Sequence, residues 1–207
     1  MYARSTSIHG NPANIDAGVA YMRDEVLPTV QQTAGCIGLS MLTDRESGRC
    51  IVATAWADEQ AMRGTAEDVT PVRDRLVQVL GGSDVDVRQW QIAVLHRDRQ
   101  AGDGAAAQVT WARIRPDHVD ELLDAYQFNL MPRLQELPGF CSVSMLVDRR
   151  TSRTVSVTSF ESHEALALVR RQARSLREQF ARAMGAHIVD LAEMDLALAH
   201  LRVPEIA

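Results

Sequence analysis

The chain has 207 residues, of which 46% are apolar, and a formal net charge of −5 at pH 7. This length and composition are sufficient for two small domains with buried cores. The acidic balance excludes a general positive surface for nucleic acid or anionic lipid. The sequence contains no apolar run typical of a signal peptide or a membrane span. We therefore expect a cytoplasmic protein with neither nucleic-acid nor membrane partners.

The first half of the chain begins with a strand pattern followed by a helix pattern. Residues 2–9 form a short β-rich run, which predicts the first strand. From Asn14, the expected N-cap, apolar residues recur at helical spacing as far as Val30. Pro28 lies near the end of this helix, where a proline can kink or stop the last turn.

A β-hairpin pattern follows this helix. Apolar residues alternate with small ones over 37–41, and a second β-rich run covers 51–56. The short polar connection between them, DRESGR, predicts that the two strands are antiparallel neighbours. Cys36 and Cys50 lie at the starts of these two strands, so the hairpin holds them at opposite ends. We expect both of them, and Cys141 in the second half, to be reduced thiols.

The second helix of this half is expected to begin after the N-cap Asp58 and to end at Gly81. Gly64 and Pro71 interrupt its apolar stripe, because glycine and proline are the least favourable residues in a helix interior. The pattern therefore predicts a bent or broken helix. A fourth strand over 87–96 completes the half.

The same order of patterns returns 104 positions later without a gap. The central stretch 35–62 pairs in this way with 139–166. Two copies of a unit of this size indicate a tandem pair of domains. We assign residues 1–98 to the first domain, 99–106 to a linker and 107–207 to the second domain.

Each half has the predicted order β-α-β-β-α-β, in which two helices cover one face of a four-stranded antiparallel sheet. This arrangement is the ferredoxin-like form of the α+β class. Both alternating sets of strand residues are mostly apolar or small, so the second face of each sheet is also expected to be buried. We therefore predict that the two sheets close against each other within one chain, as a pseudo-dimer; further self-association is left open.

Three features of each half also occur together in a known family. They are a helix end followed by glycine, a hairpin turn that starts with Asp-Arg, and a strand that ends in an aromatic and an acidic residue before a helix. They lie at Ala34-Gly35, Asp44-Arg45 and Trp56-Ala57-Asp58-Glu59, and again at Pro138-Gly139, Asp148-Arg149 and Phe160-Glu161-Ser162-His163. In these residues the chain resembles the antibiotic biosynthesis monooxygenase group of the dimeric α+β barrel superfamily. The resemblance implies an α+β barrel made of two such sheets, here within one chain.

The resemblance leaves two classes of function open. One is a cofactor-independent monooxygenase acting on a small aromatic substrate of the anthrone or quinol kind. The alternative is a duplicated barrel that binds a ligand without catalysis or has a structural role. Haem-opening members of the family use an Asn on the first strand and a Trp and a His on the second helix, and the chain lacks all three. We therefore expect a small aromatic ligand and no cofactor.

The candidate substrate-binding residues lie on the third strand of each half. Trp56 and Thr54 share one strand face, and Ser156, Thr158 and Phe160 share the equivalent face of the second copy. An aromatic substrate could stack on Trp56, whereas the alternative is that these aromatic residues only pack in the core. A pocket of about 300 Å³ or more beside either face would favour chemistry.

Two histidines are the candidate catalytic bases. His96 and His200 end equivalent strands, and a histidine can accept a substrate proton near neutral pH. The alternative is a partly exposed histidine at a strand end. No spacing of histidines or cysteines indicates a metal site. The two copies differ where a site would lie, so we expect at most one open pocket, on the Trp56 side.

Overall fold

The computed structural model describes residues 1–102 and 104–201. Contacts divide the chain into two compact units. Unit 1 comprises Met1–Trp90 together with the end of the last strand from Leu196, and unit 2 comprises Gln91–Asp195. The boundaries predicted at residues 98 and 107 describe a repeat in the sequence, and they stay a prediction.

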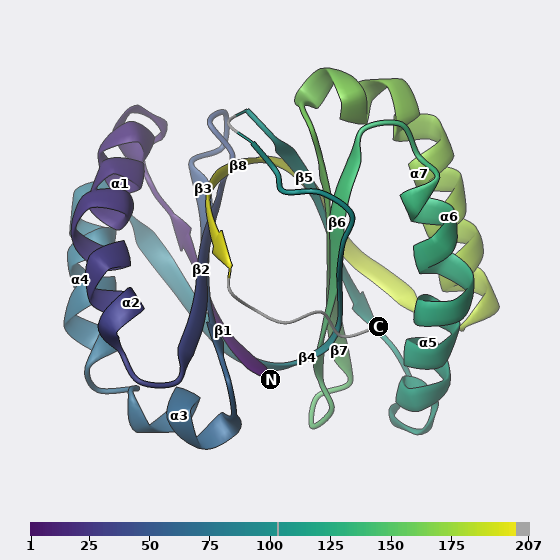
Figure 1. The fold of residues 1–207 in the computed structure, drawn as a ribbon, viewed down its shortest axis with the longest axis horizontal. Coiled ribbons are helices and arrows are strands. Elements are labelled where there is room, and N and C mark those ends of the chain that lie inside the picture. Colours follow the sequence, from purple (N-terminus) through teal and green to yellow (C-terminus); the bar gives the residue numbers. More distant parts are fainter. Residues whose placement is uncertain (103, 202–207) are drawn as a thin grey trace. The chain divides into compact units, whose positions relative to one another are not determined.

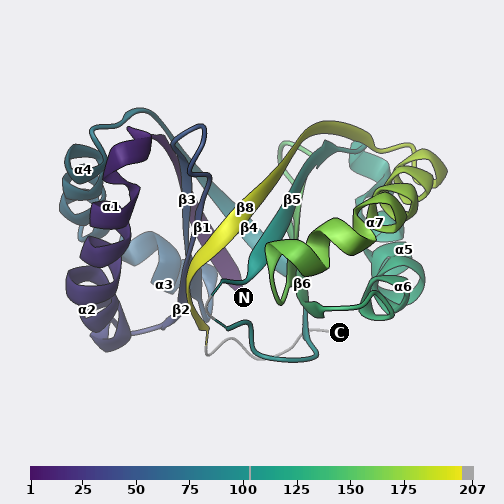
Figure 2. The same ribbon diagram turned by 90° about the horizontal axis from the view of Figure 1, so that it is seen from above.

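In unit 1, the strands β1 (Tyr2–His9), β2 (Cys36–Thr43) and β3 (Arg49–Trp56) form an antiparallel sheet with one face covered by helices (Figures 1 and 2). The unit also contains the first part of β4 (Ser83–Arg97). Its helical segments are η1 (Pro12–Asn14), α1 (Ile15–Tyr21), η2 (Met22–Val26), α2 (Leu27–Gln32), α3 (Glu59–Gly64) and α4 (Val69–Leu80). β3 lies between β1 and β2, and Thr54 is the register partner of both Arg4 and Leu39. These three side chains therefore lie side by side across the sheet.

Unit 2 repeats this order of elements. Its strands are β5 (Ala106–Arg113), β6 (Phe140–Asp148), β7 (Arg153–Phe160) and β8 (His187–Leu201), and its helical segments are η3 (Pro116–His118), α5 (Val119–Ala125), η4 (Tyr126–Leu130), α6 (Met131–Gln135) and α7 (His163–Ala183). The bounds of β1, α1, η2 and β3 recur 104 positions later in β5, α5, η4 and β7. Helices α5, α6 and α7 cover one face of the β5-β7-β6 sheet (Figure 2). The gapless repeat in the sequence is therefore a repeat of structure.

Two long strands belong partly to each unit. Residues 91–97 of β4 pair with β6, and residues 187–195 of β8 pair with β5, both antiparallel. The strand order β1-β3-β2-β8-β5-β7-β6-β4 closes on itself as a barrel. The predicted α+β fold, with two ferredoxin-like halves in an intrachain barrel, is confirmed.

The first long helix of each unit departs from the prediction in two ways. Asn14 makes no capping hydrogen bond; instead, the Asn11 side chain accepts from the backbone N–H of Ala13, because a 3₁₀ turn precedes α1. A π-helical turn, η2, then separates α1 from α2. Pro28 lies directly after this π-helical turn, near the start of α2, and the helix continues to Gln32.

The second long helix is broken in unit 1 and continuous in unit 2. α3 ends at Gly64 and α4 begins at Val69, with Pro71 in its first turn, whereas α7 runs without interruption. The expected caps are present, since Asp58 accepts from the N–H of Ala61 at 2.8 Å and Ser162 caps α7 in the same way. The break predicted from Gly64 and Pro71 is therefore confirmed.

Gly64→Ala is expected to raise the free energy of unfolding by about 0.4–1 kcal/mol, because alanine reduces the conformational freedom of the unfolded chain. No heavy atom lies within 4 Å of a Cβ added at Gly64, and its φ is outside the left-handed region. Urea denaturation followed by circular dichroism measures this change. Gly35→Ala is the matched control: its φ is +77° and the added Cβ would lie 2.6 Å from the Cβ of Ala61, so it should destabilise. A loss of stability from Gly64→Ala would contradict the described end of α3.

Candidate functional site

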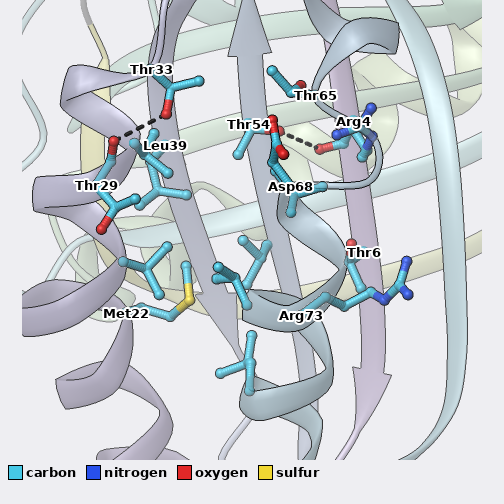
Figure 3. A pocket seen from close by; sticks show the side chains of 16 residues that line it. Arg4, Thr6, Met22, Thr29, Thr33, Leu39, Thr54, Thr65, Asp68 and Arg73 are labelled. Carbon is cyan, nitrogen blue, oxygen red and sulfur yellow. Dashed lines mark hydrogen bonds between the residues drawn. The ribbon is translucent and has the colours of Figure 1, made fainter.

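Unit 1 contains a cavity of about 140 Å³ between its sheet and the helices that cover it. The sheet contributes Arg4 and Thr6 from β1, Leu39 from β2, and Val52 and Thr54 from β3. The opposite wall comes from η2, α2 and α4, and the turn between α3 and α4 completes it (Figure 3). The cavity is smaller than the volume of about 300 Å³ that would favour chemistry.

The cavity wall is mainly apolar with a few polar groups. Met22, Val26, Val72 and Leu76 supply the apolar side chains of the helical wall. The polar groups are several threonine hydroxyls and three charged side chains. The charged residues are Arg4 on β1, Arg73 on α4, and Asp68 in the turn where the second helix is broken. An apolar wall with few polar groups is typical of a small-molecule site.

Arg4 is a buried cation, since only 7% of the residue is exposed. Its Nη2 donates to the backbone carbonyl of Met62, and its guanidinium carbon lies 5.9 Å from the centre of the Trp56 ring. Its Nη1 is buried and has no hydrogen-bond partner in the described structure. Burial lowers the pKa of Arg4, and the nearby Arg73 lowers it further. An unpaired buried donor costs about 1–3 kcal/mol, and more when it is charged.

Of the predicted residues of the first copy, Thr54 lines the cavity and Trp56 lies behind the wall. Trp56 is 1% exposed, and its Nε1 donates to Thr54 Oγ1 at 3.0 Å. The Thr54 hydroxyl in turn donates to the backbone carbonyl of Arg4, which Figure 3 marks as a dashed line. The aromatic ring therefore holds the two polar residues of the wall in place.

The equivalent place in unit 2 contains a buried aromatic side chain, Tyr126. Tyr126 stands where unit 1 has Met22, and its hydroxyl lies 2.5 Å from the Ser156 hydroxyl. Its ring packs edge-on against the Phe180 ring, with the two ring centres 5.7 Å apart. Burial raises the pKa of Tyr126. Thr158 and Phe160 are also buried in this core. The predicted residues of the second copy thus pack against the helices.

The two candidate bases lie outside the cavity wall. The ring Nε2 of His200 lies 3.1 Å from Nε2 of Gln31, and His96 contacts Gln135 in the same manner. Gln31 and Gln135 are also repeat partners, so each histidine has a glutamine contact at the same place in its own unit. Their catalytic role stays a prediction.

The remaining features of the described residues are the cysteine thiols, possible metal ligands and the apolar character of the helices. Cys36, Cys50 and Cys141 are free thiols, and burial raises the pKa of Cys50 to about 11. Over residues 1–102 and 104–201, no group of three His, Cys, Asp or Glu side chains is placed to hold a metal ion. None of the helices described is long and apolar enough to cross a membrane.

Sequence reasoning missed the charged residues of the cavity. Arg4, Asp68 and Arg73 were not singled out by motif or spacing. One signal was available, because the repeat pairs Arg4 with Gln108 while it keeps arginine at both 73 and 177. This change from an amide to a cation is a chemical difference between the copies on an inward strand face.

Comparison with solved structures defines the class of the fold. A proposed monooxygenase from Lactobacillus acidophilus aligns over 97% of this chain and 96% of its own, with a TM-score of 0.70 and 10% identity. An anthrone oxidase-like protein aligns over 100% of this chain and 95% of its own, with a TM-score of 0.64 and 15% identity. This likeness shows the fold: the chain is a ferredoxin-like α+β barrel with two tandem copies of the unit.

The curated relatives define the family more narrowly. The uncharacterized proteins Rv2558 and Rv2557 of Mycobacterium tuberculosis are each 44% identical to the whole of this chain. The alignments cover 87% and 92% of those proteins. The chain belongs to the family of Rv2557 and Rv2558. No family model matches it.

Proposed function

We propose that the cavity of unit 1 binds a small aromatic molecule with a single ring. The observation that carries this proposal is the volume of about 140 Å³ behind a mainly apolar wall. An apolar cavity of about 150 Å³ in another protein binds benzene, which sets the scale for one ring. A quinol-like ligand fits this scale, whereas a three-ring anthrone does not.

We further propose that the protein acts on this ligand as a cofactor-independent monooxygenase. Support comes from the two structural neighbours whose names denote a monooxygenase and an anthrone oxidase-like protein. Thr54 and Thr65 place hydroxyl groups on the wall that can hydrogen-bond a substrate oxygen. Asp68 is the only carboxylate among the lining residues, so it is the nearest group that could accept a proton from the ligand.

The alternative is ligand binding without catalysis. One observation favours it: neither His96 nor His200 lines the cavity. Oxygen uptake separates the two functions. A ligand that binds and consumes oxygen in the presence of the protein indicates a monooxygenase, and a ligand that binds without oxygen uptake indicates a binding protein.

Hydroquinone and toluene are expected to bind with a Kd of about 1 mM or lower, which corresponds to about −4.1 kcal/mol, and anthrone is expected to bind more weakly. Isothermal titration calorimetry measures these affinities. The matched variant is Met22→Tyr with Val52→Ser, which copies Tyr126 and Ser156 from the filled core of unit 2. It should retain the fold and lose binding.

Two results would count against the proposal. If no one-ring compound binds to the unmodified protein, the cavity is not a site for such ligands. If anthrone binds more tightly than hydroquinone, the limit set by the cavity volume is wrong.

A further inference from the structure

We propose that the ligand of the unit 1 cavity is an aromatic acid, and that its carboxylate binds the Arg4 guanidinium. This inference rests on the proposed function, because it assigns a chemical class to the ligand of the same cavity. Three features of the protein support it: the unpaired buried nitrogen of Arg4, the charges around it, and the equivalent residues in unit 2.

One buried donor nitrogen of Arg4 has no hydrogen-bond partner among the described residues. Nη2 donates to the carbonyl of Met62, and the Trp56 ring lies 5.9 Å from the guanidinium carbon. Nη1 is buried and has no hydrogen-bond partner among the described residues, and Arg4 is one of the residues that line the cavity. Buried polar atoms in folded proteins nearly always have a partner, and a buried cation needs an anion or several acceptors. A carboxylate is the partner whose geometry best matches guanidinium donors.

The charges around Arg4 favour an anion. Arg73 lines the same cavity and is close enough to lower the pKa of Arg4 by repulsion. Arg73 forms its own ion pair with the exposed Asp74. Asp68 is the carboxylate on the cavity wall, and within the described residues it forms no ion pair with Arg4. The buried guanidinium therefore lacks a counter-ion within the described part of the protein.

Unit 2 shows how the same positions are satisfied without a ligand. The repeat places Gln108 at the position of Arg4 and Arg177 at the position of Arg73. Arg177 Nη1 donates to Gln108 Oε1, so the amide oxygen is an acceptor for this guanidinium. Two arginines cannot form such a pair, because neither has an acceptor. In unit 1, a ligand carboxylate is the acceptor for the Arg4 guanidinium, as the amide oxygen of Gln108 is for Arg177 in unit 2.

The test compares benzoate with its neutral isostere benzamide and with toluene, by isothermal titration calorimetry at pH 7. Benzoate is expected to bind the unmodified protein at least about tenfold more tightly than benzamide, because a charge-assisted hydrogen bond is about twice as strong as a neutral one. Arg4→Gln, which copies Gln108, should weaken benzoate binding at least about tenfold and change toluene binding less than about twofold.

The matched control is Arg75→Gln, which removes one positive charge from an exposed position of the same helix as Arg73, away from the cavity wall. It should leave all three affinities within about twofold, which excludes an effect of net charge alone.

The possible results distinguish the aromatic-acid inference from the proposal that the cavity binds a one-ring ligand. If benzamide binds as tightly as benzoate, or if Arg4→Gln binds benzoate normally, the aromatic-acid inference is overturned while the cavity proposal stands. If neither toluene nor benzoate binds the unmodified protein, the proposed function is overturned together with the inference. Should Arg4→Gln fail to fold, the benzoate and benzamide affinities of the unmodified protein, measured at low and high salt, decide the question.

Discussion

Tyr126→Ala is expected to lower the free energy of unfolding by about 3–5 kcal/mol, the range for truncating a buried aromatic residue. Tyr126 is 2% exposed, and its ring meets the Phe180 ring edge-on. Truncation opens a void in the core of unit 2 and leaves the Ser156 hydroxyl without its partner at 2.5 Å. Urea denaturation followed by circular dichroism measures the loss.

Tyr126→Phe is the matched control, since it keeps the ring and removes only the hydroxyl. It should cost about 0.5–1.5 kcal/mol, the usual value of one hydrogen bond. The space opened by Tyr126→Ala is the size of one ring, so phenol should raise the melting temperature of this variant and not that of Tyr126→Phe. A loss below about 1 kcal/mol for Tyr126→Ala would show that Tyr126 does not fill the core of unit 2.

The fold could be predicted because local sequence patterns indicate its strands and helices, and the same patterns occur in both halves of the chain. Strand and helix periods in the first half recur without a gap in the second, so each element has an independent second observation. The break near Gly64 and Pro71 followed from backbone chemistry alone. The π-helical turns η2 and η4 could not be predicted, because a single turn of five residues is too short to leave a recognisable period in the sequence.

The cap of the first helix shows the same limit on a smaller scale. Asn11 and Asn14 both precede an apolar helical run, and either side chain can cap a helix. The 3₁₀ turn Pro12–Asn14 decides between them, and it begins at a proline that follows Asn11. The sequence therefore placed the start of the helical region within one turn, whereas the capping residue depended on the turn type.

The candidate site could be predicted only in part. Alternation along β3 placed Thr54 on an inward face, and the structure puts it on the cavity wall. Arg4 depends on more distant information, because it reaches the site through its register opposite Thr54 across two strands. Whether the space is open depends on the helix residues, methionine at 22 in one unit and tyrosine at 126 in the other. The pattern within one strand predicts neither its register with neighbouring strands nor how its side chains pack against the helices.

Trp56→Ala is expected to lower the free energy of unfolding by about 3–5 kcal/mol, because it removes a fully buried aromatic side chain. Two further contacts are lost with the ring. The Arg4 guanidinium loses its neighbouring aromatic face, and Thr54 Oγ1 loses the indole N–H that donates to it. Thermal and urea denaturation measure the change.

Trp56→Phe separates packing from direct contact with a ligand, since phenylalanine is the residue that unit 2 carries at the same position, Phe160. It keeps an aromatic ring and removes the N–H, so it should cost about 0.5–1.5 kcal/mol. Because Trp56 lies behind Arg4 and Thr54, this variant should keep the affinity for toluene and benzoate within about threefold, that is within about 0.7 kcal/mol. A loss of more than about tenfold in affinity, with the stability largely retained, would instead show that the ligand stacks on Trp56, which is one of the two alternatives that the sequence leaves open for this residue.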